Sequence, residues 1–220
     1  MHTENRPPPK RGGGFTIIEV AIVLLVIGLL LGGVLAPLST QVDNERRKTT
    51  SGTLRQINDA LLGFAVANGR LPCPDGDGDG LEDACPPNPG SEEGDVPWAT
   101  LDVGREDAWG HRIRYRVDSG FVSAPIPDPP NTVDGLIITD SGGATLATSP
   151  VAIVFSCGGD GLPNGGNDAN GAADNPICVN PGTPDATYVQ DVHTDTFDDI
   201  LIWISRNSLL NRLVAAGRWP

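Results

Sequence analysis

Aromatic residues, histidine and basic residues are all scarce in this chain, and each scarcity argues against a class of function. Of the 220 residues, 5% are aromatic and three are histidine, and 15 Lys and Arg stand against 28 Asp and Glu. The net charge of −13 and the sequence pI of about 4.4 argue against a nucleic acid as partner, and favour cations or simple solubility. Histidine is too scarce to complete a zinc site, and no CxxC motif is present.

Catalytic motifs are also lacking. His193 lies between Asp191 and Asp195, as a base with orienting acids would, but neither a nucleophile elbow nor a metal triad accompanies it. A histidine in a surface loop is the better interpretation. The glycines at 12–14 precede an apolar segment without Lys-Ser/Thr, so they do not form a phosphate-binding loop. We therefore expect no enzymatic activity and no catalytic residues.

Charge is almost absent from residues 15–38, a run of 24 residues whose one charged member is Glu19. As a helix this run is roughly 36 Å long, enough to cross a hydrocarbon core of about 30 Å. The preceding residues 1–14 contain three Lys and Arg and one Glu. Because basic residues tend to stay in the cytoplasm, we expect this leader inside and the rest of the chain outside.

Glu19 is an unusual residue for an apolar span. A charge there costs about 2.5–3.5 kcal/mol on insertion scales, so a partner is expected. Two interpretations remain open from the residues alone: the side chain reaches the lipid headgroups from the end of the helix, or it pairs with a positive group.

The basic leader, Gly14, Phe15 and the acid at Glu19 together resemble the prepilin processing signal of type IV pilins and type II secretion pseudopilins. The resemblance implies that a membrane aspartyl peptidase cleaves between Gly14 and Phe15 and methylates the new amino terminus. It also implies that Glu19 pairs with the amino terminus of a neighbouring subunit, which makes both charges tolerable. A secretory signal peptide fits less well, because the apolar run is too long, contains an acid and lacks an A-x-A exit.

This resemblance implies a structural subunit of a type IV pilus or a type II secretion filament. Its parts are a cytoplasmic leader (1–14), a transmembrane and assembly half of the helix (15–38), an amphipathic soluble half (39–69) and a periplasmic head (70–220). The expected partners are other pilin or pseudopilin subunits, prepilin peptidase, the platform protein, the assembly ATPase and the membrane. The expected location is the bacterial inner membrane, with a single crossing, or an extracellular filament. The alternative is a signal-anchored periplasmic calcium-binding or enzyme domain that does not polymerise.

The predicted fold class is α+β and pilin-like: a long N-terminal transmembrane helix packed on a small antiparallel sheet with disulfide-closed loops. Gly32 and Pro37 predict a kink or melted turn in the helix. Helix-spaced apolar residues then continue to the stop signal at Asn68-Gly69, at Val42, Leu54, Ile57, Leu61, Leu62, Phe64 and Ala65. Strands are predicted at 111–117, 135–139, 150–156 and 200–204, followed by a short amphipathic helix with Ser208 as its N-cap.

The strand at 111–117 alternates apolar and basic residues, with Ile113, Tyr115 and Val117 on one face. The other face is basic and is predicted to be a solvated surface paired with local acids, or to contact an acidic neighbour; its members are His111, Arg112, Arg114 and Arg116. Trp109-Gly110 before this strand resembles the "PWG…Y" region of the major pseudopilin of type II secretion, with Ala108 in place of the proline.

Two acidic loops are candidate calcium sites. The first spaces its acids as an EF-hand loop begins, with a glycine at the sharp turn: Asp75, Asp77, Asp79 and Asp83, with Gly80. It departs from that pattern because Pro86 stands where the bidentate Glu belongs. Cys73 and Cys85 bracket the loop, and in an oxidising periplasm we expect them to pair. The alternative is a solvated acidic turn held by that disulfide.

The second candidate is the Gly/Asn/Asp-rich loop from Cys157 to Asp199. Cys157 and Cys178 are expected to close it, although four cysteines allow three pairings. Asp160 and Asp168 are among its oxygen ligands. The major pseudopilin has a similar loop, followed by an acidic stretch before a Trp, and there the loop binds calcium; this resemblance implies Asp198 or Asp199 as a further ligand. A flexible glycine-rich surface is the alternative.

Overall fold

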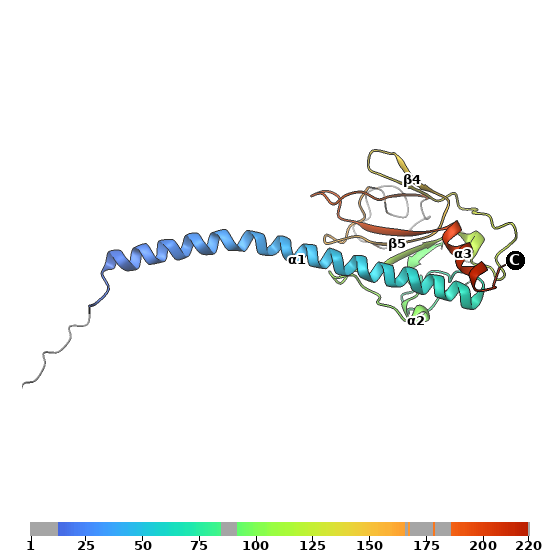
Figure 1. Ribbon diagram of the computed structural model, residues 1–220, viewed down its shortest axis with the longest axis horizontal. Helices are drawn as coiled ribbons and strands as arrows, with labels where there is room; N and C mark the ends of the chain where they lie inside the picture. Colours follow the sequence, from blue (N-terminus) through green and yellow to red (C-terminus); the bar gives the residue numbers. More distant parts are fainter. Residues whose placement is uncertain (1–12, 85–91, 166, 168–177, 179–185, 220) are drawn as a thin grey trace, which may run out of the picture. The chain divides into compact units, whose positions relative to one another are not determined.

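A single helix, α1 (Ile17–Asn68), runs through 52 residues of the chain. The fold is that of a computed structural model, which describes residues 13–84, 92–165, 167, 178 and 186–219, and only the helical backbone of residues 31–38 (Figure 1). The helix continues through Gly32 and Pro37 without a non-helical turn, so the melted turn predicted there is wrong. The chain forms two compact units, residues 1–43 and 44–220, and α1 contributes to both.

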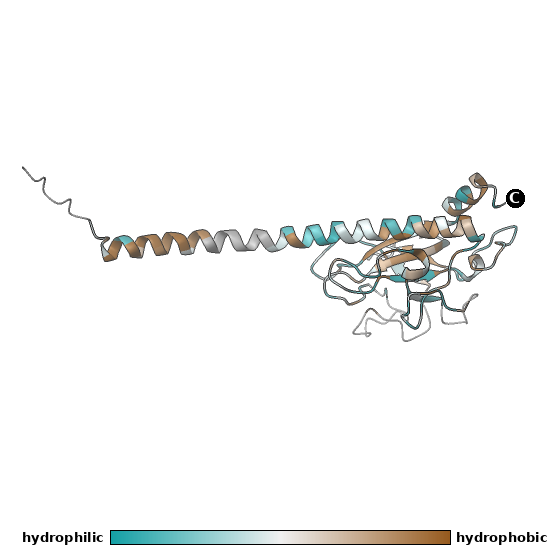
Figure 2. Cartoon of the chain, turned by 90° about the horizontal axis from the view of Figure 1, so that it is seen from below, coloured by the Kyte–Doolittle hydropathy of each residue, from teal (hydrophilic) through white to brown (hydrophobic). Residues whose placement is uncertain are grey.

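In the first unit, α1 is apolar on all sides. The large apolar side chains from Phe15 to Leu30 are 45–92% exposed. Figure 2 shows this part of the helix mostly in brown, and teal appears in the helix farther along the chain. A helix that is apolar all round buries its surface against lipid or other protein rather than water.

In the second unit, α1 is amphipathic. Leu54, Ile57, Leu61 and Ala65 are fully buried, and their spacing of three and four residues places them on one side of the helix. Of the other predicted positions, Leu62 is buried and Phe64 is half-buried, but Val42 is 50% exposed. The predicted stripe is therefore correct from Leu54 onward.

This stripe packs on a four-stranded antiparallel sheet. Its order is β1-β2-β5-β7, and its strands are β1 (Glu93–Asp95), β2 (Arg114–Val117), β5 (Pro150–Ser156) and β7 (Ile200–Ser205). Tyr115 pairs with Val154, and Ile153 pairs with Trp203. A short helix and a 3-10 turn accompany the sheet, α2 (Trp98–Leu101) and η1 (Ser119–Phe121).

A second sheet has three strands in the order β4-β3-β6, namely β3 (Ile137–Thr139), β4 (Thr145–Thr148) and β6 (Thr187–Val189). Strand β3 is antiparallel to β4 and parallel to β6. The strand predicted at 135–139 thus exists, but it does not join the single antiparallel sheet expected. Alternation of apolar residues indicates a strand and carries no information about its partner, which is why the sequence missed the second sheet.

The central strand β5 separates two cores. Ala152 and Val154 pack in the core that contains α1, whereas Ile153 and Phe155 pack in the core that contains Tyr188 of β6. Successive side chains of a strand point to opposite faces, so the four-stranded sheet lies between α1 and the three-stranded sheet. All seven residues of β5 are buried as a result.

The basic face of β2 is buried, contrary to the prediction of a solvated surface. Arg114 and Arg116 are each 4% exposed. Arg114 Nη1 donates to Asp95 Oδ1 at 2.6 Å, and Arg116 Nη2 lies 3.1 Å from Asp134 Oδ2. The predicted pairing with local acids is therefore correct, but the pairs lie inside the unit, where removing one partner leaves a buried charge.

The chain continues after β7 into α3 (Arg206–Ala215), which packs on the core of α1 through Leu209 and Leu213. The N-cap is Ser205, whose hydroxyl accepts the Ser208 N–H at 3.1 Å. Ser208 was the predicted cap, so the helix begins earlier than expected. Ser205 ends β7 and caps α3, and this leaves no loop between the two elements.

We predict opposite effects of two alanine substitutions in α1 on the stability of residues 44–220. Leu61→Ala lowers the free energy of unfolding by about 2–5 kcal/mol, because it leaves a cavity at a fully buried position. Gly63→Ala raises it by about 0.5–1 kcal/mol, since Gly63 is exposed within the helix and an added Cβ meets no atom within 4 Å. Urea denaturation of the two variants measures both values. Equal effects would contradict the orientation assigned to α1.

Candidate functional site

The residues around the predicted cleavage point lie at the start of α1. Gly14, Phe15 and Thr16 precede the helix, and Phe15 is 82% exposed. Glu19 lies in the first turn. Phe15 and Glu19 line one hollow of about 240 Å³ with Val20, Val23 and Leu24, so the acid and the residue predicted to become the amino terminus lie next to each other.

The side chains of Thr16 and Glu19 each accept a hydrogen bond from the backbone N–H of the other residue. The Thr16 hydroxyl accepts the Glu19 N–H at 3.3 Å, and Glu19 Oε2 accepts the Thr16 N–H at 3.5 Å. This reciprocal arrangement is a capping box. The sequence analysis missed Thr16, although the pattern T-x-x-E before an apolar run was sufficient to find it.

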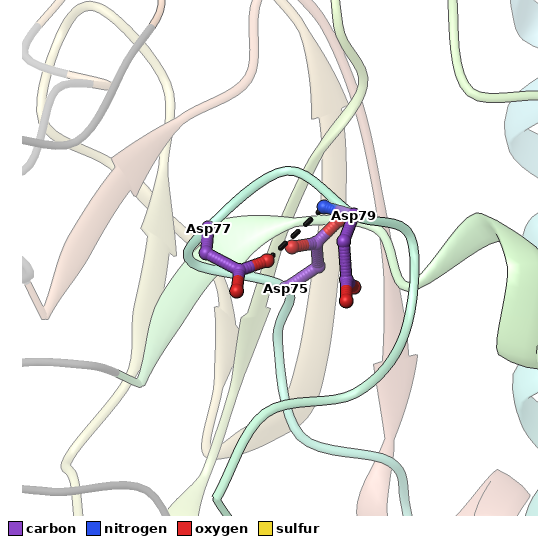
Figure 3. A group of neighbouring side chains, drawn as sticks. All are labelled: Asp75, Asp77 and Asp79. Atoms are coloured by element: carbon purple, nitrogen blue, oxygen red, sulfur yellow. Dashed lines mark hydrogen bonds between the residues drawn. The ribbon is translucent and has the colours of Figure 1, made fainter.

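The first acidic loop brings three carboxylates together (Figure 3). One oxygen atom each of Asp75, Asp77 and Asp79 lies within 4.8 Å of the others. Asp75 is 1% exposed, and its oxygens accept the N–H groups of Gly78 and Gly80 at 2.6 and 2.7 Å. The loop therefore folds around the side chain of its first acid.

Gly80 and Asp83 have other roles in this loop. Gly80 has φ +90°, and a Cβ there would lie 2.3 Å from Trp98 Cε2, so only glycine fits the turn. Asp83 does not belong to the group of three and accepts the Gly76 N–H at 2.7 Å. Cys73 is disulfide-bonded, but Cys85 lies outside the described residues, so the Cys73–Cys85 pairing stays a prediction.

A cavity of about 260 Å³ adjoins the acidic loop. Asp75 and Asp77 line it together with Asp95 of β1 and with Arg112 and Arg114. Burial raises the pKa of Asp75, an effect that the two backbone N–H groups partly oppose. The cluster thus combines a buried acid with two exposed ones, the arrangement in which a cation relieves carboxylate repulsion.

The second acidic loop is closed by a disulfide between Cys157 and Cys178, with Cα atoms 6.0 Å apart, the pairing predicted for it. Asp198 Oδ2 accepts the N–H groups of Gly159 and Asp160 at 2.6 and 3.1 Å. Asp198 therefore fastens the loop to the segment before β7. Asp168 lies outside the described residues.

Asp199 is the most buried of the described acids of this second loop. Its Oδ2 accepts from the Asn164 N–H and from Asn167 Nδ2, each at 2.9 Å, while its Oδ1 has no hydrogen-bond partner within the described part of the chain. Burial raises the pKa of Asp199 to about 7. In the same described part, Asp160, Asp198 and Asp199 do not form a group of three ligand atoms of the kind found at Asp75.

Comparison with known families identifies the N-terminal segment. Residues 9–35 match the family described as the prokaryotic N-terminal methylation motif. The chain carries a prepilin-type methylation motif. The match indicates a type IV pilin-like substrate of prepilin peptidase, with pilin-type assembly partners. No curated protein and no solved structure matches the chain.

The methylation motif includes the predicted cleavage point and Glu19, and it ends within α1. It suggests a membrane-anchored or extracellular pilin. Within the part of the chain that the structure describes, no helix combines the length and the apolar character that a membrane crossing requires. The side chains of residues 31–38, which belong to the predicted span, are not in that part. The transmembrane assignment of 15–38 is thus not confirmed.

The pKa of Asp199 predicts how pH affects the stability of residues 44–220. Folding raises this pKa from 3.8 to about 7, so between these values the folded state holds more protons than the unfolded state. The contribution of Asp199 to stability is complete below about pH 4 and is lost as the pH rises to about 7. Asp199→Asn, which resembles the protonated acid, removes this loss.

Urea denaturation at a series of pH values, in the presence of a chelator, measures the effect. The control is Asp59→Asn, which removes the same charge from an exposed position of α1. An unchanged pH dependence in Asp199→Asn would show that the buried carboxyl group does not titrate in this range.

Proposed function

We propose that this protein is a structural subunit of a type IV pilus or a type II secretion filament, that is, a minor pilin or a pseudopilin without enzymatic activity. The observation that supports it most strongly is the methylation motif at residues 9–35, on a helix whose apolar side chains are exposed. Prepilin peptidase removes residues 1–14 and methylates Phe15. The platform protein and the assembly ATPase then incorporate the subunit through α1.

The exposed apolar half of α1 is the assembly surface. Between Phe15 and Leu30 the large apolar side chains point in all directions around the helix. Burial of such surface contributes roughly 25 cal/mol per Å², so this half is stable only in lipid or among other helices. The inner membrane provides the first environment before assembly, and a bundle of identical helices provides the second in the filament.

Glu19 determines how these helices pack. In an apolar bundle an isolated carboxylate is unfavourable, and so is an isolated amino terminus. When Glu19 of one subunit meets the methylated amine of Phe15 of the next, each charge neutralises the other. The pair then selects one axial offset between neighbouring helices.

The arrangement of the head supports a structural role. Several buried polar groups in the described part of the head form contacts that hold the fold: Tyr188 of β6 donates to Glu93 of β1, and Arg114 pairs with Asp95. His193 is exposed, and its neighbour Asp191 accepts from Ser141 and from the Val192 N–H. We interpret His193 as a surface residue rather than a catalytic base.

A calcium ion in the head is a second proposal, favoured by the convergence of Asp75, Asp77 and Asp79. Calcium prefers six to eight oxygen ligands, and three carboxylates with nearby carbonyl oxygens and water provide them. The ion would hold the loop in its position against α2, where Gly80 lies against the Trp98 ring. In the alternative function, a signal-anchored calcium-binding domain, this site serves a protein that does not polymerise.

Glu19→Ala tests the assembly proposal. We expect the leader to be removed largely as in the unmodified protein, whereas incorporation into filaments falls strongly, because the amine of the neighbouring subunit is left unpaired. Immunoblots of membrane and sheared-filament fractions measure both steps. Glu45→Ala, at an exposed glutamate of the same helix, is the matched control and should assemble normally. Normal incorporation of Glu19→Ala would contradict the pairing.

Calcium binding is tested by thermal unfolding of residues 44–220 with calcium or with a chelator. We expect chelation to lower the melting temperature, because an ion that binds only the folded state stabilises it. The double variant Asp77→Asn/Asp79→Asn should abolish this difference, and Asp59→Asn should retain it. If Asp199→Asn abolishes the difference instead, the ion belongs to the second loop. A melting temperature that does not respond to calcium would exclude both sites.

A further inference from the structure

The capping box of Thr16 and Glu19 fixes the residue at which α1 begins. The carbonyl oxygen of Thr16 is the acceptor for the Glu19 and Val20 N–H groups, at 3.1 and 3.2 Å, and Gly13 to Thr16 are not helical. The Thr16 hydroxyl accepts an N–H of the first turn that otherwise has no side-chain partner. The end of the helix is thus defined by a side chain and not only by the glycines before it.

The predicted scissile bond lies immediately before this cap. Gly14 and Phe15 are joined by the peptide bond that the sequence predicts for cleavage, which lies within the methylation motif, and Phe15 is followed directly by Thr16. A peptide bond wound into a helix has its carbonyl and N–H groups engaged along the helix axis, so a peptidase must unwind it first. Glycine is about as good an N-cap as threonine, so without the Thr16 hydroxyl the helix can begin at Gly14 instead, which winds the Gly14–Phe15 bond into its first turn.

We propose that Thr16 is a positioning residue for leader removal: its cap makes α1 begin at Ile17 and so leaves the Gly14–Phe15 bond in non-helical backbone. In the cleavage step, water adds across this amide, leaving a carboxylate on Gly14 and an amine on Phe15. Thr16 takes no part in the bond changes. This inference rests on the proposed function only in requiring that prepilin peptidase cleaves the chain.

Glu19 contributes less than Thr16 to the cap. Its carboxylate contact with the Thr16 N–H, at 3.5 Å, is similar in length to the hydroxyl contact, at 3.3 Å, so the ranking follows from the roles of the two positions in a cap. Loss of an N-cap hydroxyl weakens a helix end measurably, whereas the N3 acid supplements it. Glu19→Ala is therefore compatible with largely intact cleavage, while loss of the Thr16 hydroxyl is not.

The test compares substitutions of Thr16 that separate two properties of its side chain, the ability to cap the helix and the shape. Thr16→Val keeps the shape and removes the hydroxyl, whereas Thr16→Asn changes the shape and keeps a side-chain acceptor that caps well. The full-length chain in detergent is incubated with purified prepilin peptidase, and leader removal is followed by gel shift. We expect Thr16→Val to be cleaved about fivefold more slowly. Thr16→Asn and Thr16→Ser should be cleaved at close to the unmodified rate.

Thr49→Val is the matched control, since it makes the same change at an exposed position of α1 away from the cap, and it should not alter the rate. Cleavage of Thr16→Val at the unmodified rate would overturn the proposal. Equal slowing of Thr16→Asn and Thr16→Val would overturn it as well, by indicating recognition of the threonine shape. If the unmodified chain is not cleaved at all, the assignment as a peptidase substrate fails instead, which separates the two failures.

Discussion

The rest of the structure depends on one constraint, that a single helix must satisfy two different environments. From Ile17 to Leu30, α1 exposes apolar side chains in every direction, whereas from Leu54 to Ala65 it buries one side and leaves the other to solvent. The first surface requires lipid or other helices, and the second requires a sheet. Because the helix is continuous from Ile17 to Asn68, both requirements act on one element. The two units of the chain, residues 1–43 and 44–220, divide these requirements between them.

Some charged side chains of this chain lie in apolar or buried surroundings. An unpaired charge is unfavourable there, so each of them requires a particular partner. Glu19 is the one charged residue between Phe15 and Leu30. Together with Thr16 it forms the capping box at the start of α1. In the head, Glu93 is buried beside Tyr188 and Arg114, and its burial raises its pKa. This cluster links β1 of the four-stranded sheet to β6 of the second sheet. Moving either strand out of this arrangement would leave a buried polar group without its partner, which is unfavourable.

The sequence predicted those features that depend on local patterns. The nearly uncharged run with its one acid, Glu19, the helix-spaced stripe from Leu54, the alternation in β2 and the apolar run of β5 are visible in the residues themselves, and the structure contains each of them. The Thr16–Glu19 capping box was equally local and was overlooked. The convergence of Asp75, Asp77 and Asp79 was also local, since alternate positions in a tight turn face the same centre.

Features that depend on distant contacts were not predictable. Arg114 and Arg116 were predicted to form a solvated face, because nothing in β2 itself shows that the acids Asp95 and Asp134 and a second sheet enclose them. The strands β1, β4 and β6 have three or four residues each, too few for an alternation to be recognised. Asp199 and Asn167 are 32 residues apart and meet only when the disulfide-closed loop folds back.

The most direct test of the central claim is the intact mass of the protein extracted from membranes of cells that contain prepilin peptidase. The account predicts a chain of residues 15–220 carrying one methyl group on its amino terminus, which tandem fragmentation would place on Phe15. A chain that retains residues 1–14 in the presence of an active peptidase would contradict it.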